Sequence, residues 1–206
     1  MTTVLITGFG RFPGAPFNPS GPLARAVAKR RRPAFADVKR AVHVFETSYA
    51  AVDSDLPKLM AKHKPDIVLM FGLAARTPFV RVETLARNVR SILFPDVTGY
   101  RPSERTIVRA KPSQRGQAAF AHLLAASNAS RVRTRLSRNA GRYLCNYVYW
   151  RALEASRSGT PLAQFIHIPP VANGRRPPGR KRRMSQAALL RAGEAILLAL
   201  LAAQRR

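Results

Sequence analysis

The sequence contains one cysteine, ten acidic residues and no long apolar run, and each shortage excludes a class of protein. A single cysteine rules out an intrachain disulfide and a zinc cluster built on cysteines. The longest apolar stretch, from Ala195 to Ala203, is too short to span a bilayer. Residues 2–7 have the composition of a strand rather than of a secretory signal. We therefore expect a soluble, cytoplasmic protein with no membrane partner.

The acidic residues are outnumbered by 36 lysines and arginines, which gives the chain a net charge of +26. Such an excess is found in proteins that bind nucleic acid or anionic surfaces, and also on solvated surfaces that bind no partner. No zinc-finger, helix-turn-helix or ribonucleoprotein motif accompanies the basic residues. We therefore expect no specific nucleic-acid partner. Any association through the basic runs at 29–32 and 175–183 should be non-specific and weaken with salt.

Apolar and amphipathic segments alternate along the 206 residues. The patterns predict strands at 2–7, 38–45, 66–71, 79–83 and 164–168, and helices at 20–30, 50–63, 114–126, 145–158 and 185–204. They also predict a short edge strand at 106–109, a loop at 92–103, a flexible connection at 127–140 and a mobile loop at 174–183. This order predicts one α/β domain over residues 1–206, a three-layer α/β/α sandwich with a largely parallel, mixed central sheet.

Cys145 lies at the start of a predicted helix, in which Leu144, Val148, Ala152 and Ala155 recur at helical spacing. The free N–H groups and the positive end of a helix favour a thiolate over a thiol, and the thiolate is the nucleophile. The same N–H groups can bind a developing oxyanion. The alternative is that Cys145 is a small buried hydrophobic residue, as free cysteines commonly are.

Two further candidates should meet Cys145 at one edge of the sheet. The helix from Cys145 runs about 20 Å back across the sheet, and the next strand returns to the same edge, where His167 lies near its end. His167 is then a candidate general base, and Glu83 a candidate to orient its imidazole. Each residue also has a simpler interpretation, His167 as a satisfied core residue and Glu83 as an ion-pair partner of Arg81 or Arg87.

The loop from Gly8 to Asn18 and the turn at Gly72 should reach this edge as well, because each follows the end of a predicted strand. The loop carries Phe9 and Phe12 where a phosphate-binding loop has small residues. The two rings suit an apolar pocket, or alternatively pack into the core.

Five motifs in this chain resemble the pyroglutamyl peptidase I (pyrrolidone-carboxylate peptidase) family, and together they span nearly the whole sequence. They are residues 6–9 with Phe12 and 18–20; 65–68 before Gly72; Glu83 with Asn88 and then 95–96; 141–146; and 165–169.

The resemblance implies a cysteine peptidase that hydrolyses the amide bond after an N-terminal pyroglutamyl (5-oxoproline) residue of a peptide. The family's Cys-His-Glu triad falls on Cys145, His167 and Glu83, and its reaction passes through an acyl-enzyme. No metal and no cofactor is implied. The family is often tetrameric, so a homo-oligomer stays open.

The resemblance also places Phe9, Phe12 and Asn18 near the substrate ring, a neutral lactam that requires apolar contacts and few hydrogen bonds. Leu73 stands in this subsite where the family usually has glutamine, and Leu93 stands where it usually has arginine. The second change would weaken oxyanion stabilisation. The alternative function is therefore a catalytically weakened homologue that acts as a binding protein, with non-specific nucleic-acid association through its basic surface.

Overall fold

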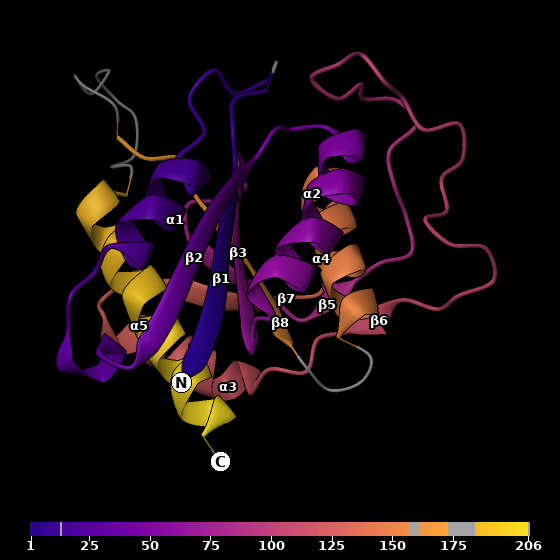
Figure 1. The fold of residues 1–206 in the computed structure, drawn as a ribbon. Coiled ribbons are helices and arrows are strands. Elements are labelled where there is room, and N and C mark those ends of the chain that lie inside the picture. The colour runs from indigo at the N-terminus through magenta and orange to yellow at the C-terminus, as the bar shows by residue number, and fades with distance from the viewer. Residues whose placement is uncertain (13, 157–160, 173–183, 206) are drawn as a thin grey trace, which may run out of the picture.

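The computed structural model describes residues 1–12, 14–156, 161–172 and 184–205, and shows a six-stranded sheet between two layers of helices (Figure 1). The strands of this sheet are β1 (Thr2–Phe9), β2 (Val38–Phe45), β3 (Ile67–Leu73), β4 (Val80–Glu83), β7 (Thr134–Ser137) and β8 (Leu162–Ile168). The helices are α1 (Ser20–Ala28), α2 (Tyr49–His63), α3 (Phe120–Ala129), α4 (Leu144–Ala155) and α5 (Gln186–Gln204), with a 3-10 turn η1 (Pro33–Phe35). β5 (Leu85–Ala86) and β6 (Gln114–Arg115) form a separate two-stranded ribbon.

The strands of the large sheet are ordered β2-β1-β3-β8-β4-β7. The first four run parallel to one another, β4 runs antiparallel to β8, and β7 runs parallel to β4. A mixed, mostly parallel sheet with helices on both sides confirms the predicted fold class. The carboxyl ends of β1, β3 and β8 meet at one edge, as parallel strands must.

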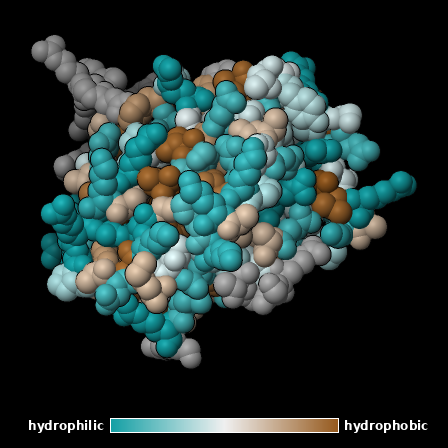
Figure 2. All heavy atoms as spheres, viewed as in Figure 1, coloured by the Kyte–Doolittle hydropathy of each residue, from teal (hydrophilic) through white to brown (hydrophobic). Residues whose placement is uncertain are grey.

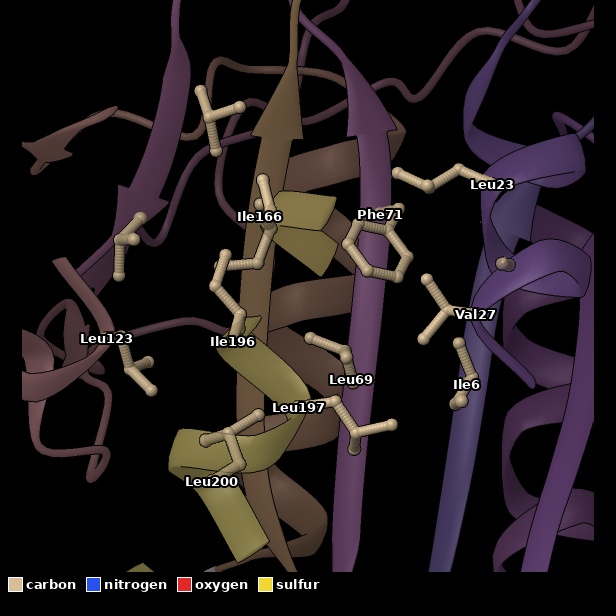
Figure 3. Close-up of a cluster of buried hydrophobic side chains, with 14 of the residues drawn as sticks. Ile6, Leu23, Val27, Leu69, Phe71, Leu123, Ile166, Ile196, Leu197 and Leu200 are labelled. Carbon is tan, nitrogen blue, oxygen red and sulfur yellow. The ribbon is translucent and has the colours of Figure 1, made fainter. Parts of the chain in front are cut away.

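Each face of the sheet has its own hydrophobic cluster, because successive residues of a strand point to opposite faces. On one face, Ile6, Leu69 and Ile166 pack against residues of α1, α3 and α5 (Figure 3). On the other face, Met70 and Phe165 pack against α2 and α4, whose aromatic residues fill that cluster. α4 is thereby held against β3 and β8, the two strands that lead to the predicted site.

Helix α5 has a mean hydropathy of 1.6 over an 18-residue window, enough by length and composition to cross a membrane. In the structure this helix packs against α1, α3 and β3, and Leu197 and Leu200 are fully buried. Glu194, also buried, pairs with Arg30 and Arg32. These contacts are typical of a core helix. On the molecular surface, hydrophilic residues cover most of the face shown in Figure 2, and small apolar patches lie between them.

One prediction about the sheet was wrong, because the flexible connection expected at 127–140 contains the end of α3 and the strand β7. The sequence analysis did not predict this strand because the segment is polar and basic, a composition typical of a loop. Arg133 and Arg135 lie over the ring of Phe79, with guanidinium carbons 5.6 and 4.6 Å from its centroid. β7 is a short, charged edge strand, a design that discourages pairing with another chain.

Two predictions for residues 106–126 were also wrong. No strand forms at 106–109, because the N–H groups of Ile107 and Val108 donate to Asn88 Oδ1, at 2.9 Å each. The helix expected from 114 begins at Phe120, since residues 114–115 pair with β5 as β6. The mobile loop predicted at 174–183 falls on residues outside the described ranges, and α4 ends at Ala155, a few residues before the end predicted near 158.

The close approach of β1 and α1 generates a prediction about Gly8. A Cβ atom at this position would lie 2.5 Å from the carbonyl oxygen of Ser20 and 2.8 Å from the backbone nitrogen of Gly21. Gly8→Ala should therefore lower the free energy of unfolding by about 2–3 kcal/mol, measured by denaturant titration.

Gly10→Ala is the matched control, because its Cβ would meet nothing nearer than the carbonyl oxygen of Phe45 at 3.5 Å. Equal unfolding free energies for the Gly8 and Gly10 variants would contradict the prediction.

Candidate active site

The edge of the sheet predicted to hold the site encloses a cavity of about 300 Å³. Its walls come from segments far apart in sequence: the loop after β1, the turn after β3, the residues that lead into α4, and parts of β4 and β8. Cys145 and His167 both line it. The topology inferred from the sequence thus brings these two residues together.

Glu83 reaches the same site from β4. Its Oε1 lies 2.8 Å from Nδ1 of His167, and both side chains are buried. In the antiparallel pairing of β4 with β8, Arg81 lies opposite His167, so Glu83, two residues further on, points to the same face. A carboxylate that accepts the Nδ1 proton leaves Nε2 as the acceptor nitrogen of the neutral ring.

Cys145 is the second residue of α4, and no side chain caps the start of this helix. The first N–H groups of α4 are therefore available to an anion. A Cβ at Gly72 would lie 2.8 Å from Sγ of Cys145 and 2.6 Å from the ring of Phe165. Because Gly72 is also the register partner of His167, the missing side chain leaves room for the thiol beside the imidazole.

The electrostatics of the pair differ from the sequence-based expectation. Burial raises the pKa of the Cys145 thiol to about 12, and the negative charge of Glu83 adds to this rise, while Arg81 opposes it. Burial lowers the pKa of His167, against the effect of Glu83. The resting pair is therefore a thiol and a neutral imidazole. The backbone N–H at the helix start lowers the pKa of the thiol, as the sequence predicted, but the effect of burial is larger.

Arg81 is a residue of the site that the sequence analysis treated only as a partner for Glu83. Its Nε and Nη2 donate to Glu83 Oε1 at 2.8 and 2.5 Å, and Nη2 also donates to the carbonyl oxygen of Asn139. The same Nη2 lies 3.4 Å from Nδ1 of His167. Glu83 thus contacts the imidazole and forms an ion pair as well. The sequence did contain a signal for Arg81 as a site residue, because strand alternation places it on the same face as Glu83.

All four residues predicted to contact the substrate line the cavity: Phe9, Phe12, Asn18 and Leu73. The amide of Asn18 is already engaged, since Nδ2 donates to the carbonyl oxygen of Gly10 at 2.9 Å and Oδ1 accepts from Ser20 Oγ at 2.8 Å. Asn18 therefore holds the loop in place. Leu93 is 68% exposed and lies outside the cavity lining.

Two side chains hold the start of α4: Asn146, to which the sequence analysis gave no role, and Arg87, which it considered only as a partner of Glu83. The buried Asn146 accepts from the Arg87 N–H at 2.9 Å and donates to the carbonyl oxygens of Arg87 and Val89 at 2.7 and 2.8 Å. Arg87 Nη2 in turn donates to Asn139 Oδ1 and to the carbonyl oxygen of Gly141. Gly141 has a φ of 88°, a left-handed conformation that favours glycine. These bonds anchor the segment that presents Cys145.

Across the described part of the chain, no three His, Cys, Asp or Glu side chains are grouped so that they could hold a metal ion. A thiol and an imidazole line the cavity at the edge of an α/β sheet, and a buried carboxylate contacts the imidazole from behind the cavity wall. Fold and site together define a hydrolase of the cysteine peptidase class. A model of the pyroglutamyl peptidase family matches residues 2–183. The chain belongs to the pyroglutamyl peptidase family.

Curated relatives and a solved structure agree with this assignment. The chain is 34% identical to the pyrrolidone-carboxylate peptidase of Clavibacter michiganensis, over 82% of this chain and 79% of that protein. It is 31% identical to the one from Thermococcus kodakarensis, over 81% and 80%. The structure of the pyrrolidone carboxyl peptidase from Thermococcus litoralis matches with a TM-score of 0.87 and 28% identity, over 98% of this chain and 94% of that chain.

The contact between Arg81 and the imidazole predicts a change in pH dependence. Arg81 lowers the pKa of His167, so its removal should raise that pKa. The sequence analysis predicts that His167 is the general base, which must be neutral to accept a proton, so we expect the acidic limb of the kcat/KM profile to move to higher pH in Arg81→Met.

Arg76→Met is the matched control, because Arg76 lines the same cavity but is not among the groups that shift the pKa of His167. Its midpoint should equal that of the parent protein. An unmoved or lower midpoint in Arg81→Met would contradict the prediction.

Proposed function

We propose that this protein is a cysteine exopeptidase that hydrolyses the amide bond after an N-terminal pyroglutamyl residue of peptides. The observation that carries the proposal is that Cys145 and His167 line one cavity, while the buried Glu83 contacts His167 Nδ1 at 2.8 Å. The names of the relatives, pyrrolidone-carboxylate peptidases, support the choice of substrate.

The proposed reaction starts from the thiol and the neutral imidazole. Glu83 holds the Nδ1 proton, so Nε2 of His167 takes the proton of Cys145 as Sγ attacks the substrate carbonyl. The imidazolium, stabilised by Glu83, then protonates the leaving amine, and the pyroglutamyl group stays on sulfur as a thioester. Water, activated by the same imidazole, hydrolyses this acyl-enzyme and frees the thiol.

The lining of the cavity favours a substrate without a free α-amine. Phe9, Phe12 and Leu73 provide apolar walls for the ring, and no Asp or Glu is among the lining residues. A free ammonium group would therefore be desolvated without a carboxylate to pair with. Because Leu73 has no polar atom and Asn18 is engaged in the loop, we infer that backbone groups make most of the hydrogen bonds to the lactam.

Arg81 offers a source of oxyanion stabilisation that does not depend on position 93. Its Nη1 makes no hydrogen bond to the described residues, and the side chain lines the cavity. We infer that this guanidinium and the first N–H groups of α4 face the carbonyl oxygen as it becomes negative. In this arrangement the exposed Leu93 does not abolish catalysis.

The second candidate is a weakened homologue that acts as a binding protein, and the raised pKa of Cys145 is the observation that favours it. Hydrolysis of a chromogenic pyroglutamyl amide, with and without a thiol-alkylating reagent, separates the two. Alkylation-sensitive turnover supports the peptidase, and binding of the amide without turnover supports the weakened homologue.

We expect Cys145→Ala and Cys145→Ser to abolish hydrolysis of the chromogenic amide, with kcat/KM reduced by about 10⁴-fold or more. The fold should persist, because the thiol fills a small space at the cavity wall. Thermal unfolding of each variant is the control. Substantial turnover by the folded alanine variant would rule out covalent catalysis by Cys145.

His167→Ala should cost nearly as much activity as loss of the thiol, while Glu83→Gln should cost less, because the acid only orients and stabilises the base. The rate of Cys145 alkylation near neutral pH should also fall in His167→Ala, since no base remains to remove the thiol proton. Equal alkylation rates in the parent protein and this variant would show that His167 does not activate the thiol.

A further inference from the structure

A second hollow lies beside the segment that leads into Cys145. Arg142 lines this hollow, whereas its neighbours Gly141 and Tyr143 line the active-site cavity. The hollow has a volume of about 550 Å³ and is open to solvent. Four of its lining residues are basic and none is acidic: Arg87, Arg105, Lys111 and Arg142, with Asn88, Val89, Pro112 and Ser113.

The positive charge of this hollow has few counterparts nearby in sequence. Between Glu104 and Glu154 the chain has ten lysines and arginines and no acidic residue, and three of the four basic lining residues belong to this stretch. Lys111 Nζ lies 3.6 Å from Glu154 Oε1. In the described ranges, the side chains of Arg105 and Arg142 make no ion pair or hydrogen bond. Both residues are exposed and line the hollow, and no Asp or Glu is among its lining residues.

The walls of the hollow are held in place by hydrogen bonds of the protein itself. Arg87 is fixed by Asn139 Oδ1 at 2.6 Å and by the carbonyl oxygen of Gly141 at 3.0 Å, and its buried Nε has no hydrogen-bond partner. Asn88 binds the backbone of residues 107–111 through four hydrogen bonds, two of them at 2.6 Å. The part of the wall formed by Arg87, Asn88 and the backbone of residues 107–111 is therefore fixed in advance and loses little conformational entropy when a ligand binds.

We propose that this hollow is a binding site for a small phosphate-type oxyanion. Arginine guanidinium groups match a phosphate with paired N–H donors, and Lys111 adds a further charge. A doubly charged anion would offset the repulsion among four cations better than a single carboxylate would. This site is distinct from the proposed peptidase chemistry, because none of its basic residues lines the active-site cavity.

The phosphate could come from a free anion or from a nucleic-acid backbone, and the experiment distinguishes these sources. Inorganic phosphate and pyrophosphate are titrated calorimetrically into the full chain in about 0.15 M NaCl, where weak surface attraction is screened. A single-stranded oligonucleotide is titrated in parallel. The test variant is Arg105→Gln with Arg142→Gln. The matched control is Arg25→Gln with Arg191→Gln, which removes the same charge from exposed positions on α1 and α5, across the sheet.

We expect saturable binding of pyrophosphate or phosphate to one site, weakened at least about tenfold in the Arg105/Arg142 variant and unchanged in the control. Oligonucleotide binding lost in parallel, and displaced by pyrophosphate, would identify a nucleic-acid backbone as the source. If neither phosphate nor pyrophosphate shows saturable binding, the proposal is overturned. Equal weakening in both double variants would also overturn it, because binding would then follow net charge rather than the hollow. Thermal unfolding confirms that each variant is folded.

Discussion

The site depends on the antiparallel pairing of β4 with β8. This pairing sets Arg81 opposite His167 and brings Glu83 Oε1 to 2.8 Å from the imidazole Nδ1. A shift of one residue would point Glu83 to the other face of the sheet and separate the carboxylate from the ring. The ring would then lose the group that fixes its tautomer and stabilises its cation. Strand register is therefore as important to the chemistry as the identity of the residues.

Burial of the site changes the pKa values of Cys145 and His167. Burial raises the pKa of Cys145 and lowers the pKa of His167, and both shifts favour the uncharged forms of the two side chains. Arg81 shares the carboxylate of Glu83 with the imidazole and so moderates the negative charge next to the thiol. Among the described lysines and arginines, Arg76 and Arg81 line the cavity. Another concentration of positive charge, around Arg105 and Arg142, is the hollow proposed to bind an oxyanion.

The errors in the predicted strands and helices share a physical cause, which is long-range hydrogen bonding. Local pattern predicted a strand at 106–109, but Asn88, nearly twenty residues earlier, takes two of its N–H groups. The polar and basic pattern around Thr134 predicted a loop. In the structure, residues 134–137 pair with β4 and form the strand β7. The carbonyl oxygens bound by Asn146 show the same effect at the site. None of these partners is apparent from a local window of sequence.

The sequence by itself determined the alternation of strands and helices, the helix start at Cys145 and the meeting of Cys145 with His167 at one sheet edge. These follow from periodicity and from the rule that parallel strands end on the same side. Only the tertiary structure decided the direction and register of β4, the entry of Arg81 into the cavity, and the protonation state at rest. Those properties depend on contacts between distant residues and on exclusion of water, which no local pattern encodes.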